Sequence, residues 1–229
     1  SAPARSTIKK GILEYFKNVE LFEAYGSTEA GMVTLLRPED QLRKIGSIGR
    51  ECLGTDTIKL LDESGNEVGV GEVGELYSRG PMMFNEYYKM REKTRASFKG
   101  DYFTARDMAK KDEDGYYYLV DRKDNMIITG GEHVYPSEVE EIISRYPKVF
   151  DVAIIGVPND IWGEAVKAVV ILKEGEKATQ EEVIDWCREK MAGYKKPKTV
   201  DFIKPEEMPR TATGKILHRK LRERYSTPL

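Results

Sequence analysis

Residues 121–132, with the sequence DRKDNMIITGGE, decide how the 229-residue chain is divided. The segment begins with charged and polar residues, 121–125, and continues with an apolar run, 126–129, that has the length and β-branched content of a strand. Gly130 and Gly131 follow, and because glycine has no Cβ they allow another group to approach the backbone closely. This order predicts a domain boundary in the charged segment and a new folding unit after it.

Beyond the boundary, helix-like and strand-like segments alternate. A helix is predicted at 136–143, where Pro136 occupies the first turn, and another at 179–191, which opens with a Thr-x-x-Glu capping box. Strands are predicted at 126–129, 152–157, 165–172 and 199–203. This alternation predicts a small α+β domain over residues 125–229, with helices packed on an open sheet.

Before the boundary, residues 1–123 begin with apolar residues at helical spacing, which predict a helix at 5–17 followed by a strand at 19–25. Glycines recur between 45 and 88 among short strand-like pieces. An Asp-Gly turn then joins strands predicted at 102–110 and 115–120. This half is therefore predicted to contain a β-rich subdomain, either a small antiparallel sheet or a barrel-like one, and the chain to be of mixed α/β and α+β class.

The composition restricts the classes of partner and location to expect for the protein. With 37 basic and 39 acidic side chains the net charge is -2, which gives no electrostatic reason to expect nucleic acid or an anionic membrane as partner. The sequence contains no apolar run near the ~20 residues that a membrane span requires, and its mean hydropathy is -0.55. Cys52 and Cys187 lie far apart without metal-ligand spacing, which favours a reducing, cytoplasmic location.

The first chemical motif is Tyr25-Gly26-Ser27-Thr28-Glu29. It places an aromatic ring, two hydroxyls and a carboxylate in one turn, so that the ring could stack on a base, the hydroxyls contact phosphate oxygens and the carboxylate bind Mg²⁺. Taken alone, the pentapeptide also fits a plain polar turn after a strand.

The second motif is the segment 209–215, PRTATGK, which places Lys215 on a small polar loop before a basic helix at 216–224. It is not the phosphate-binding G-x-x-x-x-G-K-[ST] motif, because Pro209 stands where that motif has glycine and Ile216 where it has a hydroxyl. A lysine on such a loop suits a phosphate or carboxylate oxygen. The alternative is a solvated surface lysine.

Together with Asp107, the segments 25–29, 121–132 and 209–215 resemble, in order and spacing, the adenylate-forming enzyme superfamily of acyl-CoA synthetases, adenylation domains and luciferases. The resemblance runs over essentially the whole chain and implies an enzyme that joins a carboxylic acid to AMP, using ATP and Mg²⁺, and passes the acyl group to a thiol. It also implies that 1–123 is the C-terminal part of a large N-terminal domain, that 125–229 is the small C-terminal lid domain, and that Asp124 is the hinge.

The resemblance implies a role for each motif residue. In the nucleotide loop that also contains Gly26 and Ser27, Tyr25 would stack on adenine, Thr28 would contact the phosphates and Glu29 would hold Mg²⁺. Asp107 would accept hydrogen bonds from the ribose hydroxyls, and Arg122 would add a second nucleotide contact. Lys215 would approach the acyl carboxylate and the α-phosphate during adenylation, where a positive charge stabilises the transition state.

The nearest branch resembles the acyl-CoA synthetases, through the segments 156–164 and 194–198. There Trp162, Tyr194, Lys196 and Lys198 would bind the CoA nucleotide, and Gly130 and Gly131 would line the passage for pantetheine. The alternative is a core tryptophan under a turn and a solvated lysine face. The acid is not identified, because among these residues only 30–33 are expected to touch it.

Three departures from the family pattern stand out. Ala105 and Arg106 precede Asp107 where the family has Thr-Gly, and His218 stands where arginine is common. No Ser/Thr/Gly-rich loop for the β- and γ-phosphates lies upstream of Tyr25, so the resemblance covers only the C-terminal portion of such an enzyme, and these residues alone are expected to be inactive in adenylation. The alternatives are a non-catalytic nucleotide- or CoA-binding module and an adenylation domain that loads a carrier-protein thiol. Surface left exposed by truncation would favour self-association.

Overall fold

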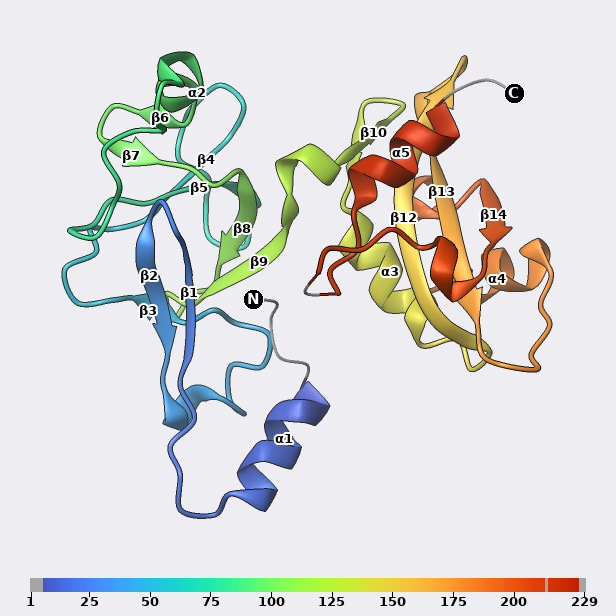
Figure 1. Ribbon diagram of the computed structural model, residues 1–229, viewed down its shortest axis with the longest axis horizontal. Helices are drawn as coiled ribbons and strands as arrows, with labels where there is room; N and C mark the ends of the chain where they lie inside the picture. The colour runs from blue at the N-terminus through green and yellow to red at the C-terminus, as the bar shows by residue number, and fades with distance from the viewer. Residues whose placement is uncertain (1–5, 213, 227–229) are drawn as a thin grey trace. The chain divides into compact units, whose positions relative to one another are not determined.

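The computed structural model describes residues 6–212 and 214–226. The chain divides into two compact units, a first unit of Ser1–Lys123 and a second unit of Asp124–Leu229, and Figure 1 shows the elements of each. No helix in the described part of the chain combines the length and apolar character needed to cross a bilayer.

The first unit opens with helix α1 (Ser6–Tyr15), which is followed by a three-stranded antiparallel sheet of β1 (Glu23–Ser27), β2 (Gly31–Leu36) and β3 (Arg50–Glu51). The sequence analysis predicted α1, and its strand at 19–25 matches β1 only from Glu23 onward, while β2 was not predicted. A bulge interrupts the pairing of β1 with β2 between Tyr25 and Gly26. A Cβ on Gly26 would lie 2.0 Å from the carbonyl oxygen of Gly31, so only glycine fits at this close approach of two backbones.

The first unit also contains a four-stranded sheet and a small two-stranded sheet of β6 (Phe98–Lys99) and β7 (Tyr102–Phe103). The four-stranded sheet has the order β4-β5-β8-β9, is antiparallel throughout and is open, which is the first of the two predicted forms. Its strands are β4 (Lys59–Leu61), β5 (Gly74–Tyr77), β8 (Asp107–Lys111) and β9 (Tyr117–Arg122). The short helices near it are η1 (Pro38–Asp40) and α2 (Arg91–Ala96). The three sheets share one apolar core, which includes Val33, Leu76, Phe103 and Tyr117.

The second unit is built on a five-stranded sheet of order β11-β10-β13-β12, with β14 parallel to β13. The strands are β10 (Ile127–Thr129), β11 (Glu132–Val134), β12 (Val149–Asn159), β13 (Gly163–Leu172) and β14 (Thr199–Phe202). The helices are η2 (Lys123–Asn125) at the boundary, α3 (Pro136–Ser144), α4 (Gln180–Trp186), η3 (Gly193–Lys195), η4 (Pro205–Glu207) and α5 (His218–Ser226). The open sheet with helices confirms the α+β prediction for this half.

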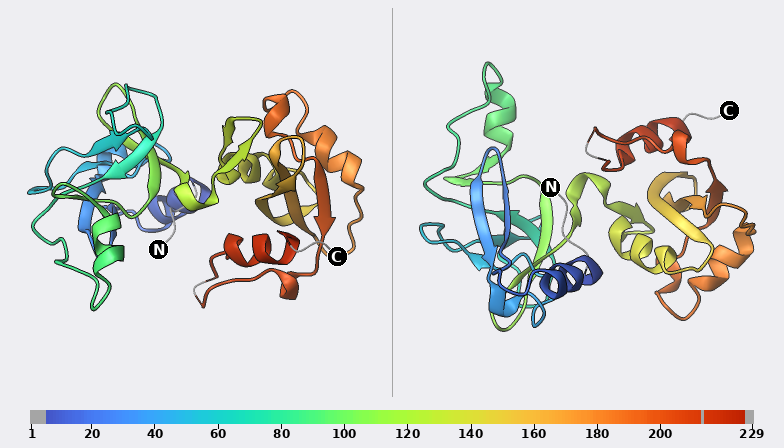
Figure 2. Two further views of the ribbon diagram at one scale, coloured as in Figure 1. Left: turned by 90° about the horizontal axis from the view of Figure 1, so that it is seen from above. Right: turned by 60° about the horizontal axis from the view of Figure 1, so that its bottom comes forward.

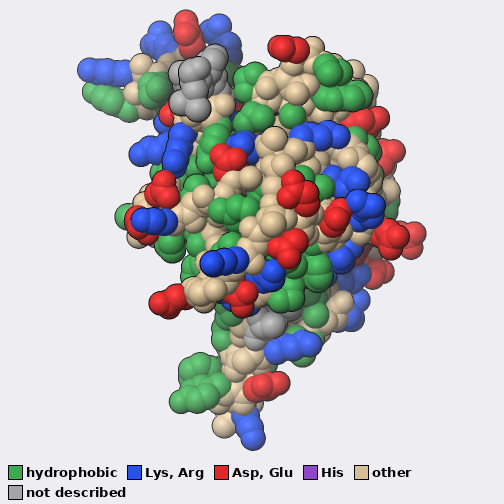
Figure 3. Space-filling view, turned by 90° about the vertical axis from the view of Figure 1, so that its right-hand side faces the viewer, with side chains coloured by type: hydrophobic (Ala, Val, Ile, Leu, Met, Phe, Trp, Pro, Cys, Tyr) green, Lys and Arg blue, Asp and Glu red, His purple; other side chains and the backbone are tan. Residues whose placement is uncertain are grey.

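Alternate residues of β12 point to opposite faces, as in any strand. Val152 and Ile154 join the core under α3 and α4, whereas Ala153 and Ile155 pack with Leu221 of α5. Figures 1 and 2 accordingly show α5, in red, on the opposite side of the sheet from α3. Figure 3 shows acidic and basic side chains interspersed over the face turned to the viewer, in keeping with the small net charge.

One helix is shorter than predicted. The capping box of α4 is present, since the Thr179 side chain accepts from the Glu182 N–H and the Glu182 side chain from the Thr179 N–H. The prediction that this helix reaches residue 191 was wrong, because α4 ends at Trp186. Glu189, beyond the end, has a φ of 64°, a left-handed conformation that an α-helix does not continue through.

Candidate functional site

The loop between β1 and β2 carries the first motif. Ser27 Oγ accepts the Ala30 N–H at 3.0 Å and thereby closes the turn, while Thr28 is exposed. An open hollow of about 430 Å³ is lined by this loop, including Tyr25, Gly26, Ser27, Thr28 and Met32. The loop therefore presents backbone and hydroxyl groups to a space that a small ligand can enter.

Tyr25, Asp107 and Arg122 meet at one place in the first unit. The Tyr25 hydroxyl donates to Asp107 Oδ2 at 2.7 Å, and Arg122 Nε lies 3.2 Å from Asp107 Oδ1. Asp107 and Arg122 are direct partners in the pairing of β8 with β9, which explains their contact. Burial and the negative charge of Asp107 raise the pKa of Tyr25 above its ordinary value, so the hydroxyl stays protonated and donates.

Glu29 is held by a residue that the sequence analysis missed. The Tyr87 hydroxyl donates to Glu29 Oε1 at 2.9 Å, and burial together with this hydrogen bond raises the pKa of Tyr87. The aromatic run at 84–88 was the available signal, but it does not show which ring faces Glu29. Among the described residues no group of three or more histidine, cysteine or carboxylate side chains is arranged for a metal. A single oriented carboxylate fits Mg²⁺, which usually keeps several waters and takes one or two carboxylates plus substrate phosphates.

The departure before Asp107 leaves the backbone turn in place. Arg106 has a φ of 63°, in the left-handed region that favours glycine. Its N–H donates to Thr104 Oγ1 at 2.8 Å and its carbonyl accepts the Lys123 N–H at 2.8 Å. Because both backbone groups are hydrogen-bonded, a bulky cation is accommodated next to Asp107.

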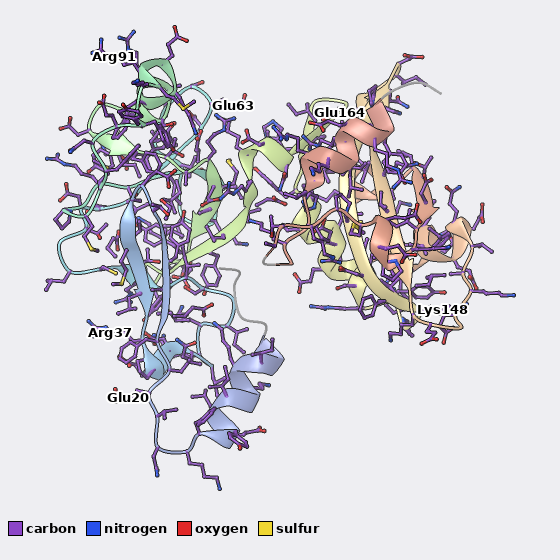
Figure 4. All side chains as sticks on the ribbon, in the orientation of Figure 1. Glu20, Arg37, Glu63, Arg91, Lys148 and Glu164 are labelled. Carbon is purple, nitrogen blue, oxygen red and sulfur yellow. The ribbon has the colours of Figure 1, made fainter. Side chains whose placement is uncertain are left out.

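In the second unit, Gly130 and Trp162 are in contact. Gly130 has a φ of 60°, its N–H donates to the Trp162 carbonyl at 2.9 Å, and a Cβ there would lie 2.8 Å from Cε3 of the indole ring. Trp162 is nevertheless 49% exposed, so it is not a core residue under a turn. Nearby, Glu164, labelled in Figure 4, accepts the Ile128 N–H at 2.9 Å and ties β13 to β10.

The remaining CoA candidates lie on another segment of the second unit. Tyr194, in η3, and Lys198 are exposed, and Lys196 is half-buried. The Lys198 N–H donates to the Val166 carbonyl at 2.8 Å, three residues along β13 from Gly163, which is a rise of about 10 Å from the turn that carries Trp162. Gly131 has a φ of 86° and no atom within 4 Å of where its Cβ would be.

Lys215 is exposed at the end of a hydrogen-bonded loop. Its carbonyl accepts the Thr211 N–H at 2.8 Å, and its N–H donates to Thr211 Oγ1 at 3.1 Å. Arg210 donates to the Gly214 carbonyl at 2.9 Å and pairs with Asp151 of β12. The backbone of the loop is thus attached to the sheet while the Lys215 ammonium extends into solvent.

Comparison with known proteins identifies the family. The model of the AMP-binding enzymes matches residues 1–88, and that of the AMP-binding enzyme C-terminal domain matches residues 138–215. The chain belongs to this family of adenylate-forming enzymes, as the motifs predicted.

Individual relatives agree with this family assignment. The chain is 39% identical over 219 residues to a long-chain-fatty-acid–CoA ligase of Yersinia pestis, covering 94% of this chain and 38% of the relative. It is 40% identical over 210 residues to a feruloyl-CoA synthase of an Amycolatopsis species, covering 91% and 42%. Among solved structures, ATP-bound MatB of Rhodopseudomonas palustris aligns with a TM-score of 0.87 at 34% identity, covering 98% of this chain and 44% of MatB. MenE, the o-succinylbenzoate CoA synthetase of Bacillus subtilis, aligns in complex with its acyl-adenylate at 0.85 and 29%, covering 100% and 46%. The chain thus spans about two fifths of the length of its relatives.

Proposed function

We propose that the chain is the C-terminal portion of an AMP-forming acyl-CoA synthetase, which converts a carboxylic acid, ATP and CoA to acyl-CoA, AMP and pyrophosphate. The observation that carries the proposal is the meeting of Tyr25, Asp107 and Arg122 from three strands beside the open loop hollow. The names of the relatives support the class of reaction, and they include both fatty-acid and aryl-acid ligases.

Asp107 has the capacity to hold a ribose. Each of its oxygens has one partner among the contacts given above, and an ionised carboxylate offers about four lone-pair positions, so both oxygens can also accept from ribose hydroxyls. The Tyr25 hydroxyl is tied to the same carboxylate, which fixes the ring for stacking on adenine. The Arg122 guanidinium, about half exposed, remains accessible for a second contact to the nucleotide.

Adenylation requires charge stabilisation at the α-phosphate. A carboxylate oxygen of the acid attacks the α-phosphorus, the bond to the bridging oxygen breaks, and pyrophosphate leaves with the bonding electrons. Thr28 would donate to a phosphate oxygen, and Lys215 would pair with the charge that develops on the α-phosphate. Glu29, oriented by Tyr87, would hold Mg²⁺, which neutralises phosphate charge.

Thioester formation uses other residues of the second unit. The CoA sulfur attacks the acyl carbon, the bond to AMP breaks, and AMP leaves. Trp162, Tyr194, Lys196 and Lys198 would bind the CoA nucleotide, while Gly130 and Gly131 would border the pantetheine arm. We propose that 1–123 belongs to the large domain, that 125–229 is the lid, and that rotation about Asp124 exchanges Lys215 for the CoA residues.

A second candidate function is a binding module. The 229 residues contain no Ser/Thr/Gly-rich phosphate loop, so a polypeptide of these residues alone would bind nucleotide without adenylating an acid. Correct positioning of the reactants lowers many activation barriers by roughly 7–11 kcal/mol. Loss of the contacts to the β- and γ-phosphates would remove much of this effect. Pyrophosphate release by this polypeptide with ATP, Mg²⁺ and a panel of acids would contradict this. A ligase that loads a carrier protein would be distinguished by its failure to use free CoA.

Two further expectations belong to this proposal. The large apolar side chains exposed on the first unit, among them Tyr15, Phe16 and Leu53, favour self-association of the isolated polypeptide, which sedimentation analysis would detect. The two free cysteines are in keeping with a reducing cytoplasm.

AMP binding tests the nucleotide site directly. Titration calorimetry with the 229-residue polypeptide should detect AMP, and Asp107→Asn should weaken binding about 10-fold or more, since hydrogen bonds to a charged group contribute about 1.5–3 kcal/mol. Asp101→Asn is the matched control, because Asp101 is 78% exposed and lies outside the cluster. Equal affinities for the wild type and Asp107→Asn would contradict the assignment.

A further inference from the structure

Lys123, the last residue of the first unit, is held to that unit by its side chain and its backbone. Its Nζ lies 2.8 Å from Oε2 of Glu75, a β5 carboxylate that is 5% exposed. Thr104 Oγ1 donates to the other oxygen of Glu75 at 3.0 Å, and the Lys123 N–H donates to the Arg106 carbonyl. Leaving a buried carboxylate without its cation is costly, so Glu75 keeps Lys123 in place.

On the other side of the boundary, Arg222 of α5 binds three consecutive carbonyls. Its Nη1 donates to the Asp124 carbonyl at 2.7 Å, while its Nη2 donates to the Asn125 carbonyl and lies 3.3 Å from that of Met126. A guanidinium presents several donors in a fixed plane, which suits a set of adjacent oxygens better than an ammonium does. The first residues of the second unit are therefore fastened to α5.

Helix α5 is itself firmly attached within the second unit. Leu221, next to Arg222, is fully buried in the core under this helix. On the same helix, His218 Nε2 lies 2.7 Å from Glu140 Oε1 of α3. Arg222 thus projects from a fixed support, and its hydrogen bonds hold the boundary segment in one position relative to the second unit.

The same helix follows the Lys215 loop. Lys215 precedes the start of α5 by three residues, and its loop is fixed by the Thr211 hydrogen bonds and the Arg210–Asp151 pair. A movement of the second unit therefore carries the boundary segment, α5 and Lys215 together. Between the two anchors the backbone contains only ψ of Lys123 and φ and ψ of Asp124.

We propose that Glu75, Lys123 and Arg222 are positioning residues that confine rotation between the two units to the Lys123–Asp124 link and transmit it to Lys215. This inference rests on the proposed function, in which rotation about Asp124 exchanges Lys215 for the CoA residues. The anchors themselves require no turnover, so they can be tested in the 229-residue polypeptide without an activity assay.

Tryptic cleavage after Arg122 and Lys123 reports whether the boundary is fastened. Glu75→Gln and Arg222→Met leave the sequence at these bonds unchanged but remove one anchor each. Each substitution is expected to speed cleavage at the boundary about 10-fold, because one charge-assisted contact no longer opposes opening of the segment. Mass spectrometry would compare this rate with cleavage at Lys167 in the middle of the sheet, which serves as an internal reference for unfolding.

The controls are neighbours of the same type. Arg224→Met removes an arginine of the same helix that pairs with Glu207, and Glu72→Gln changes an exposed glutamate whose side chain accepts the Gly69 N–H. Both should leave the boundary rate unchanged. Unchanged cleavage in both anchor variants, or acceleration equally at Lys167, would overturn the proposal. Arg222→Lys, which retains the charge but fewer donors, should give an intermediate rate and provides the test if Arg222→Met does not fold.

A distance measurement addresses the rotation. Spin labels on Glu63→Cys in the first unit and Glu176→Cys in the second, with Cys52→Ser, would give the distribution of distances between the units; Figure 4 labels Glu63. Cys187 is fully buried and burial raises its pKa to about 11, so it should escape labelling. The distribution should broaden in Arg222→Met and Glu75→Gln but not in the controls. An unchanged width of the distance distribution would refute the roles of Glu75 and Arg222 as anchors. If the enzyme proved not to be a CoA ligase, the proposed function would fail but the distance result would still stand.

Discussion

Substitution of Gly130 by alanine should destabilise the second unit through Trp162. Gly130 has a φ of 60°, and an L-residue in this conformation costs roughly 1–2 kcal/mol. The new Cβ would also lie 2.8 Å from the indole ring, which must shift, and inserting an extra methyl group into a packed site typically costs about 1–3 kcal/mol. The expected loss of unfolding free energy is therefore about 2–5 kcal/mol.

Gly131 provides the matched control. It also has a left-handed φ, 86°, but no atom lies within 4 Å of its added Cβ, so Gly131→Ala should show only the conformational cost of about 1–2 kcal/mol. A loss of 1 kcal/mol corresponds to about 4–8 °C in Tm for a unit of this size. Gly130→Ala should therefore melt several degrees below Gly131→Ala.

Tryptophan fluorescence is the appropriate assay, because both tryptophans of the chain, Trp162 and Trp186, belong to the second unit. The indole contact is isolated by a double-mutant cycle with Trp162→Ala, read by circular dichroism. In that background the two glycine variants should differ little. If Gly130→Ala and Gly131→Ala melt at the same temperature in the presence of Trp162, the close contact between glycine and ring is refuted.

The remaining predictions concern chemistry and pH. In an enzyme that spans the full length of the relatives, Lys215→Ala should slow acyl-AMP formation about 10²–10³-fold and spare thioester formation from supplied acyl-AMP, with exposed Lys220→Ala as control; equal loss in both steps would contradict the role. Trp162→Ala or Lys196→Ala should instead weaken use of CoA while pyrophosphate release persists. Burial raises the pKa of the Cys187 thiol from 9.0 to about 11, so the folded state retains this proton more tightly and its contribution to stability, complete below pH 9, is lost as the pH rises to about 11. Cys187→Ala should flatten the decline of unfolding free energy with pH in that window, and an unchanged slope would show that the thiol does not contribute. Tyr25→Phe should remove a tyrosine that resists ionisation in an alkaline absorbance titration and should weaken AMP binding.

Local pattern was sufficient for most elements of the fold. The Thr179–Glu182 box marks the start of α4, and the Asp-Gly turn marks the β8–β9 hairpin. The strand β2 was missed because its six residues are an apolar run beside a polar loop, which has no distinctive period. The early end of α4 was missed because the left-handed conformation of Glu189 is uncommon for glutamate, so the residue type gives no signal that the helix stops before it.

The contacts of the candidate site depend on pairing that sequence spacing does not contain. Tyr25 and Asp107 are 82 residues apart and Glu29 and Tyr87 are 58 apart, and each pair meets only because of how the strands and loops of the first unit pack. The resemblance supplied the roles of Tyr25, Asp107 and Glu29, but it could not supply Tyr87 or the Glu75–Lys123 pair, whose partners are defined by the folded first unit.

Arg106 shows how the first unit tolerates a change of residue at the turn before Asp107. The sequence places a long cation where the family has glycine, yet the backbone keeps a left-handed φ, because Thr104 and Lys123 satisfy its N–H and its carbonyl. Each of these two residues also contacts the buried carboxylate of Glu75. The turn before Asp107 and the anchor before Asp124 are therefore parts of one hydrogen-bonded network. A substitution at Glu75 should consequently affect both Asp107, the proposed ribose ligand, and the boundary between the units.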